Sequence, residues 1–164
     1  MLDARLVEAL PRLRRIARAI VGPHRPDDAE ELLQRTLTRL LASDAASIAD
    51  QHAALAYART TMMRIWIDEQ RSTRRRVRRL LRLAATSAPF SAPPSAADEV
   101  ETLEALRRAC ANLPPRHRAA IALRVVEELS YAEIAAALQI SEENVRACCH
   151  RARRALRHAL GEPQ

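Results

Sequence analysis

The stretch SYAEIAAALQISEENVRACCHRARRAL, from Ser130 to Leu156, repeats apolar residues at helical spacing, stops, and starts again within a few residues. Residues three and four apart share one face of an α-helix, so the stretch predicts two short amphipathic helices. The first apolar face holds Tyr131, Ile134, Ala135 and Leu138, and the second holds Val145, Cys149, Ala152 and Leu156. Because the connection LQIS is so short, the two helices must cross at a large angle to share one core.

This geometry predicts a helix-turn-helix, in which the second helix enters the major groove of DNA. Ser141 is expected to cap that helix, with Glu142 and Glu143 in its first turn. The outward face of the helix would carry Arg146, His150, Arg151 and Arg154. Arginine reads guanine edges, and side chains of both kinds contact phosphates. An ordinary pair of helices with a solvated charged face remains an alternative, because the turn lacks the glycine that such motifs often have.

The composition favours an all-α protein with a polyanionic partner. The 164 residues include two glycines and four aromatic residues, whereas alanine, leucine and arginine dominate, which suits helices and argues against a sheet. All 27 basic residues are arginine, and they outnumber the 20 acidic residues to give a formal net charge of +7. Such a balance suggests a polyanion as partner.

A segment rich in alanine, serine and proline divides the chain. Residues 85–98 read ATSAPFSAPPSAAD and show no helical period, which is typical of a flexible linker. We therefore predict two small helical domains, at residues 1–83 and 98–161, joined by a linker at 84–97.

Three helices are expected in the first domain. The first covers residues 2–21, where Pro11 could kink or split it, and the sequence GPHRP then ends it. Asp27 or Asp28 is expected to cap the second helix. A long third helix is expected over residues 53–79.

Several function classes find no support in the sequence. Nucleotide-binding loops, nucleophile motifs and metal-ligand spacings are missing, so we expect no enzyme, no cofactor and no metal. The adjacent Cys148 and Cys149 lack a metal-like partner, although Cys148 remains a redox candidate. No apolar run approaches the roughly 20 residues that span a bilayer, and the charged N-terminus lacks a signal-peptide core. With three cysteines, an odd number, we expect a reduced, cytoplasmic protein.

Residues 113–157, from LPPRHRAAIALRVVEELS through the helix-turn-helix to RARRALR, resemble domain four of the bacterial extracytoplasmic-function (ECF) sigma factors of the sigma-70 family. The resemblance rests on the motifs L-P-x-x-x-R, S-Y-x-E-I-A and R-A-R-x-x-L. It implies that this domain reads the minus-35 promoter element. The base readers would be Arg146, His150 and Arg151, and the phosphate contacts would be Arg116, Arg118 and Arg153.

Residues 27–41, DDAEELLQRTLTRLL, resemble the family helix that docks on the clamp coiled coil of the largest RNA polymerase subunits. The resemblance implies that Asp28, Glu31, Leu33 and Gln34 bind the polymerase. The alternative is an amphipathic helix that packs only within its own domain.

Residues 56–79, AYARTTMMRIWIDEQRSTRRRVRR, resemble the family helix that engages the minus-10 element, where separated strands are held and a base is flipped out. The resemblance implies DNA contacts from Arg64, Trp66, Arg71, Arg74 and Arg75. Two alternatives remain open. Trp66 could belong to the core, and the arginine run could be a solvated helix end.

The sequence departs from the family pattern at several contact positions. Arg64 stands where relatives have asparagine, and Ala147 and Cys148 replace a polar and a basic residue. The resemblance implies core RNA polymerase, promoter DNA and an anti-sigma factor as partners, without membrane insertion. Two rivals to a working sigma factor remain: a sigma-like decoy that sequesters an anti-sigma factor, and a free-standing helix-turn-helix regulator.

Overall fold

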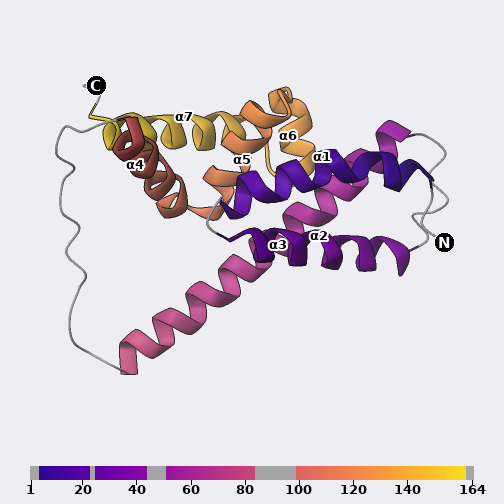
Figure 1. Ribbon diagram of the computed structural model, residues 1–164, viewed down its shortest axis with the longest axis horizontal. Helices are drawn as coiled ribbons and strands as arrows, with labels where there is room; N and C mark the ends of the chain where they lie inside the picture. Colours follow the sequence, from indigo (N-terminus) through magenta and orange to yellow (C-terminus); the bar gives the residue numbers. More distant parts are fainter. Residues whose placement is uncertain (1–3, 23–24, 44–50, 84–98, 162–164) are drawn as a thin grey trace.

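The computed structural model describes residues 4–22, 25–43, 51–83 and 99–161, and within these ranges the chain forms seven helices and no strand. The helices are α1 (Ala4–Val21), α2 (Pro26–Leu41), α3 (Gln51–Leu83), α4 (Glu99–Asn112), α5 (Pro115–Val126), α6 (Tyr131–Leu138) and α7 (Glu142–Ala159). Figure 1 shows α1 and α2 side by side, α3 running past both, and α4 to α7 gathered above them. The predicted all-α fold is confirmed.

The first three helices bury one apolar face each against the others. Leu13 and Ile20 of α1, Leu32 of α2 and Met62 and Met63 of α3 are each at most 2% exposed. Pro11 lies within α1, which nevertheless stays one helix. The long helix expected over residues 53–79 is confirmed and is longer than predicted at both ends.

The predicted cap of α2 is wrong by two residues or more. Arg25 occupies the N-cap position and makes no side-chain capping bond, and Pro26 starts the helix. The fixed φ of proline suits the first helical turn, where its missing N–H costs nothing. Asp27 and Asp28 therefore lie in the first turn, near the positive end of the helix dipole.

The second group of helices packs on the first group. Helix α5 lies against α1, and α6 lies against α3. One apolar cluster runs without interruption from Leu13 and Met62 to Leu123, Ile134 and Cys149. The helices of the predicted domains therefore share a core instead of standing apart. The predicted linker, residues 84–97, lies outside the described residues.

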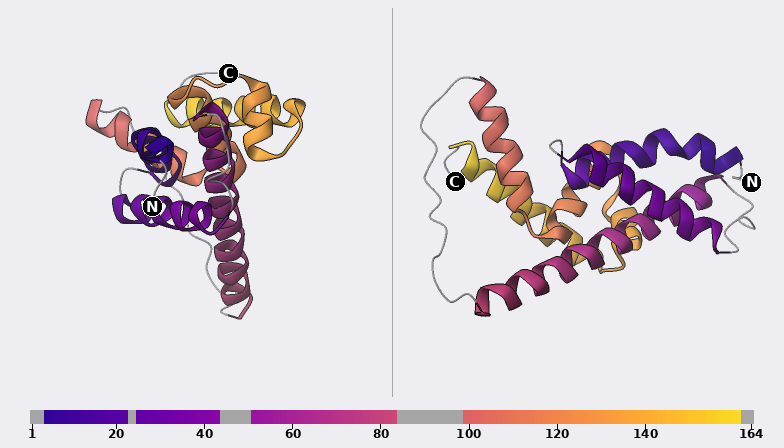
Figure 2. Two further views of the ribbon diagram at one scale, coloured as in Figure 1. Left: turned by 90° about the vertical axis from the view of Figure 1, so that its right-hand side faces the viewer. Right: turned by 60° about the horizontal axis from the view of Figure 1, so that its bottom comes forward.

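Helix α3 reaches beyond this shared core. Its first half buries one face, but residues 71–77 are all exposed. Both views in Figure 2 show this end of α3 projecting from the body of the molecule. The end of α3 that extends beyond the core therefore carries the cationic residues Arg71, Arg74, Arg75 and Arg76.

Candidate nucleic-acid interface

Helix α6 begins with a complete capping box. The Ser130 hydroxyl accepts from the Glu133 backbone N–H at 3.2 Å, and the Ser130 backbone N–H donates to the Glu133 carboxylate at 2.8 Å. The Ser130 hydroxyl also donates to the Glu133 carboxylate at 2.7 Å, and this bond, together with the one from the Ser130 backbone N–H, holds the pKa of Glu133 below its usual value, because both donors favour the charged carboxylate. The exchange satisfies two backbone donors that the helix itself leaves free, and so fixes where α6 starts.

The turn between α6 and α7 is made without glycine. Gln139 takes the left-handed conformation, with φ 53° and ψ 50°, and the Ile140 N–H donates to the Ala135 carbonyl at 3.2 Å. Ser141 then caps α7, since its hydroxyl accepts from the Asn144 N–H at 3.3 Å. The predicted cap is confirmed, and the sharp turn lets both helices bury their apolar faces.

Helix α7 has one sealed face and one basic face. Val145, Cys149 and Ala152 are at most 1% exposed. The exposed side carries five predicted or neighbouring cationic residues: Arg146, His150, Arg151, Arg153 and Arg154. This arrangement agrees with the predicted outward face, and it exposes the five side chains to an external anion.

Two contacts orient Arg146. Its guanidinium carbon lies 5.5 Å from the centre of the Tyr131 ring, and its Nη2 lies 3.4 Å from a Glu142 carboxylate oxygen. Tyr131 is also flanked by Arg124, whose guanidinium carbon lies 5.1 Å from the ring centre. Arg124 is fixed in turn by a 2.6 Å hydrogen bond to the Leu129 carbonyl. Tyr131 therefore contacts two arginines, one structural and one exposed.

Of the three predicted phosphate contacts in the second group of helices, two are exposed and one points inward. Arg116 and Arg153 are exposed. Arg118 instead points inward, where it donates to the carbonyls of Ala111 at 2.7 Å and Ile20 at 3.3 Å. Its guanidinium carbon also lies 5.4 Å from the centre of the Trp66 ring. Burial lowers the pKa of Arg118. A phosphate contact by Arg118 would require it to give up these internal partners.

The predicted minus-10 residues also differ in their exposure to solvent. Arg64, Arg71, Arg74 and Arg75 are exposed, whereas Trp66 is 2% exposed and belongs to the core. Arg64 donates to the Gln139 side chain at 2.9 Å, and Arg71 lies 3.7 Å from Asp68. In this arrangement Trp66 does not face solvent, so the alternative of a core tryptophan describes it.

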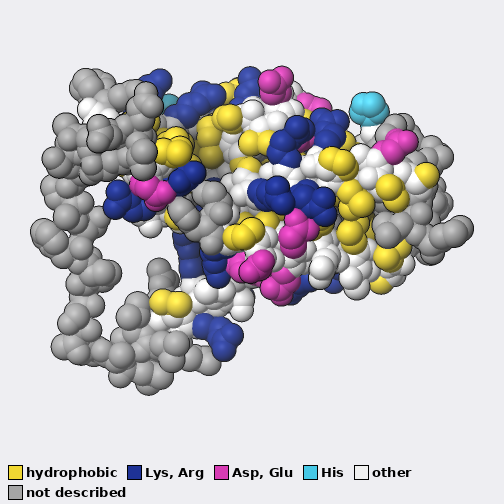
Figure 3. Space-filling model, viewed as in Figure 1, with side chains coloured by type: hydrophobic (Ala, Val, Ile, Leu, Met, Phe, Trp, Pro, Cys, Tyr) yellow, Lys and Arg dark blue, Asp and Glu magenta, His cyan; other side chains and the backbone are white. Residues whose placement is uncertain are grey.

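An acidic surface lies where α2 begins. Asp28, Glu31 and Gln34 face outward or are half-buried, but Leu33 is 3% exposed and packs inside. Figure 3 shows the acidic side chains beside a band of basic ones over α1. Arg35, one turn after Glu31, forms an ion pair with Glu69 of α3. Burial raises the pKa of Glu69, and the Arg35 charge opposes that rise.

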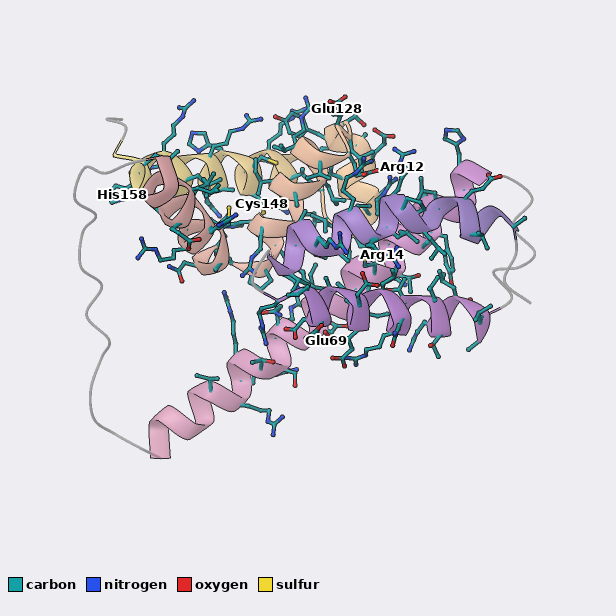
Figure 4. All side chains as sticks on the ribbon, in the orientation of Figure 1. Arg12, Arg14, Glu69, Glu128, Cys148 and His158 are labelled. Atoms are coloured by element: carbon teal, nitrogen blue, oxygen red, sulfur yellow. The ribbon has the colours of Figure 1, made fainter. Side chains whose placement is uncertain are left out.

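Glu127 is the residue that the sequence reasoning missed. Its side chain is fully buried, and its carboxylate accepts from Arg12 at 3.1 Å and from Arg15 at 3.0 Å. Figure 4 shows Arg12 beside the loop that carries the neighbouring Glu128. Burial lowers the pKa of Arg59, and the charges of Glu133 and Glu127 only partly oppose this change. The sequence EE at positions 127–128 gave no sign of which glutamate is buried.

The cysteines of α7 are both buried. Cys148, the redox candidate, is 8% exposed, and Cys149 is 1% exposed. Burial raises the pKa of both thiols, which lowers the fraction of reactive thiolate. Among the residues that the structure places, His, Cys, Asp and Glu do not gather in threes as metal ligands do. No helix in the described ranges has the length and apolarity to cross a bilayer.

Comparison with known proteins places this architecture in a family. Residues 6–76 match sigma-70 region 2, and residues 103–156 match sigma-70 region 4. The chain is 32% identical over 135 residues to the RNA polymerase sigma-E factor of Streptomyces antibioticus, covering 82% of this chain and 72% of that one. Its fold resembles the sigma factor RpoE in complex with the anti-sigma factor NepR from Bartonella quintana, with a TM-score of 0.67 and 22% identity over 97% of this chain and 96% of that one. The resemblance seen in the sequence is therefore confirmed, and the chain belongs to the ECF group of the sigma-70 family of RNA polymerase sigma factors.

Proposed function

We propose that this sigma factor directs RNA polymerase to promoters with two elements, and that α7 reads the minus-35 element. The supporting observation is the exposed row of Arg146, His150 and Arg151 on a helix whose other face is sealed. Such a helix enters the major groove with its polar face toward the base edges. Arg116 and Arg153 contact the phosphates that flank the reading residues.

The minus-10 element is assigned to α3. Arg64, Arg71, Arg74 and Arg75 supply cationic groups along one helix and its projecting end. Arginines that are spaced this closely neutralise phosphates and hold a separated DNA strand. Trp66 can stack on a DNA base only in an arrangement in which Arg118 no longer lies over the Trp66 ring.

Core polymerase is assigned to the start of α2. Asp28, Glu31 and Gln34 supply polar and acidic groups for a partner with basic ones, while Leu33 supports the helix from within. An anti-sigma factor is the further partner that we propose. The factor acts in the cytoplasm, where polymerase and promoters are found.

Two DNA-binding units on one chain gain effective concentration from their connection. Once one unit is bound, the other searches a small volume, so that neither needs to bind tightly alone. We assign this connection to residues 84–97, between a first unit at residues 1–83 and a second at residues 98–161.

Run-off transcription with purified core polymerase tests the assignment of α7. A guanine contact by arginine is worth about 1–3 kcal/mol, so Arg146→Ala should lower initiation at cognate promoters about 5- to 150-fold at limiting sigma factor. Arg108→Ala, an exposed arginine of α4, is the matched control and should initiate like the wild type. Equal initiation by Arg146→Ala and the control would remove Arg146 from the reading surface.

The same assay tests the decoy, and a gel shift tests the free-standing regulator. A decoy supports no transcription initiation from any promoter of a library. A free-standing regulator instead binds specific duplex DNA without polymerase, which gel-shift titration detects.

For the polymerase surface, the double variant Asp28→Arg and Glu31→Arg should weaken core binding in a pull-down titration, and unchanged affinity would remove this end of α2 from the interface.

A further inference from the structure

A cavity opens where the end of α1 and the start of α2 meet α4 and the start of α5. Its volume is about 610 Å³, within the range of roughly 300–1,000 Å³ that is usual for small-molecule sites. Figure 1 shows the lower end of α4 close to the end of α1. The described residues that line the cavity include none from α3 or α7, so it is separate from the surfaces assigned to DNA.

The walls of the cavity are apolar and aliphatic. Ala19 and Val21 come from α1, and Leu106 and Ala111 come from α4. Three of these side chains are half-buried and Ala111 is exposed, so their packing is incomplete. No aromatic side chain is among the described residues of the lining, so a nucleotide base finds no ring on which to stack. An aliphatic body gains most from such walls, because its binding removes apolar surface from water on both sides.

The same cavity carries an excess of positive charge. Arg18, Arg107 and Arg118 line it, and the described residues of the lining include no carboxylate. Glu30 lies 3.6 Å from Arg18, and Glu104 lies 2.7 Å from Arg107, so two of the three charges have an acidic partner outside the lining. Arg118 forms no ion pair with any described residue. The balance of three positive and two negative groups leaves one positive charge, which favours a ligand with a single negative charge.

The guanidinium of Arg118 also has a hydrogen-bond donor to spare. Its Nη atoms donate to the carbonyls of Ala111 and Ile20, whereas its Nε is buried and has no acceptor in the part of the chain that the structure describes. Burial lowers the pKa of Arg118, and the charge of Arg74 lowers it further. A buried donor of a charged group that lacks an acceptor costs free energy. A negatively charged oxygen ligand removes this cost, and a carboxylate matches the planar guanidinium.

We propose that this cavity binds an aliphatic monocarboxylate, whose carboxylate pairs with Arg118 and Arg107 and whose chain lies between Val21 and Leu106. The site goes beyond promoter reading, since it uses none of the residues that we assign to bases, phosphates or polymerase. Both parts of the ligand are required. A neutral chain leaves the arginines without an anion, and a small anion leaves the apolar walls in water.

Isothermal titration calorimetry of the full chain with sodium decanoate, below its micelle-forming concentration, tests the site. We expect saturable binding of one decanoate per chain. Decanol lacks the charge and acetate lacks the chain, so each should bind at least about tenfold more weakly. The fluorescence of Trp66, the single tryptophan, gives a second signal, because Arg118 lines the cavity and its guanidinium carbon lies 5.4 Å from the centre of the Trp66 ring.

Two pairs of variants locate the binding. Arg107→Gln removes one partner of the carboxylate and should weaken decanoate binding about fivefold or more, whereas Arg108→Gln, an exposed neighbour outside the lining, should bind like the wild type. Leu106→Glu places a negative charge on the apolar wall and should abolish measurable binding. Leu103→Glu, at an exposed position of the same helix, should not. Circular dichroism verifies folding, and if Leu106→Glu unfolds, the Arg107 and Arg108 pair decides.

The proposal is overturned if the wild type shows no saturable binding of decanoate. Equal binding of decanol would show a hollow that takes any apolar chain, and tighter binding of acetate or inorganic phosphate would show a plain anion site. Either result overturns the proposal, as do equal affinities of Arg107→Gln and Arg108→Gln. All of these measurements use the free protein without DNA or polymerase, so they decide the site independently of the proposed function.

Discussion

Replacing Arg118 by alanine should destabilise the protein, although the sequence assigned this residue to DNA. The guanidinium is committed to internal partners from both groups of helices. It donates to the Ala111 carbonyl at 2.7 Å and to the Ile20 carbonyl at 3.3 Å, and it lies over the ring of Trp66. The substitution removes all of these contacts together.

The size of the effect follows from those contacts. A hydrogen bond from a charged donor contributes about 1.5–3 kcal/mol, and here the bond to Ala111 is short while the bond to Ile20 is long. A cation–π contact adds about 0.5–2 kcal/mol. Because part of the side chain meets solvent, we expect a loss of about 2–3 kcal/mol in the free energy of unfolding. Arg118→Lys keeps the charge near Trp66 but not the planar fork, so it should lose about half as much.

Urea unfolding followed by circular dichroism measures the loss, and the fluorescence of Trp66 reports on the site. Trp66 is the single tryptophan of the chain, so its emission is unmixed. Removal of Arg118 should admit water to the ring and shift the emission to longer wavelength. A loss below about 0.5 kcal/mol, with unchanged emission and reduced initiation, would refute the reasoning and return Arg118 to the DNA contacts.

Two further predictions concern the helix-turn-helix. Ser130→Ala removes half of the capping box and should cost about 1 kcal/mol near neutral pH, measured by urea unfolding. Because the folded pKa of Glu133 lies below its ordinary value of 4.5, its contribution is present above that pH and is lost as the pH falls through the folded pKa, so the difference between variant and wild type should shrink in acid. Tyr131→Leu should lower initiation about two- to fivefold by releasing Arg146, whereas Tyr131→Phe, which keeps the ring, should not; equal run-off transcription by the two variants would show that the ring does not position Arg146.

Local patterns allowed the helix-turn-helix to be predicted in some detail. The cap at Ser141, the sealed face with Val145 and Cys149, and the exposed face with Arg146 all follow from three- and four-residue spacing within a short segment. Even the turn without glycine formed, because Gln139 adopts the left-handed conformation itself. The all-α fold class followed from composition and periodicity together.

Contacts between distant parts of the chain could not be predicted in this way. The partners Arg12 and Glu127 are 115 positions apart, and Arg118 reaches a carbonyl 98 positions away. Periodicity shows that a face is apolar, but it does not show which other face covers it. The inward placement of Trp66 and Arg118 and the burial of Glu127 all depend on that missing information.

Helix α3 is continuous from the shared core to its projecting end, and its 33 residues amount to a rod about 50 Å long. The portion from Arg64, which contacts Gln139, to the end of the helix is a lever arm of about 28 Å. A tilt of roughly 7° at this contact would swing the far end of the helix by about 3.5 Å, close to the rise of one base pair. A small adjustment near Gln139 would therefore shift the far end of this helix by a full step along a nucleic-acid strand.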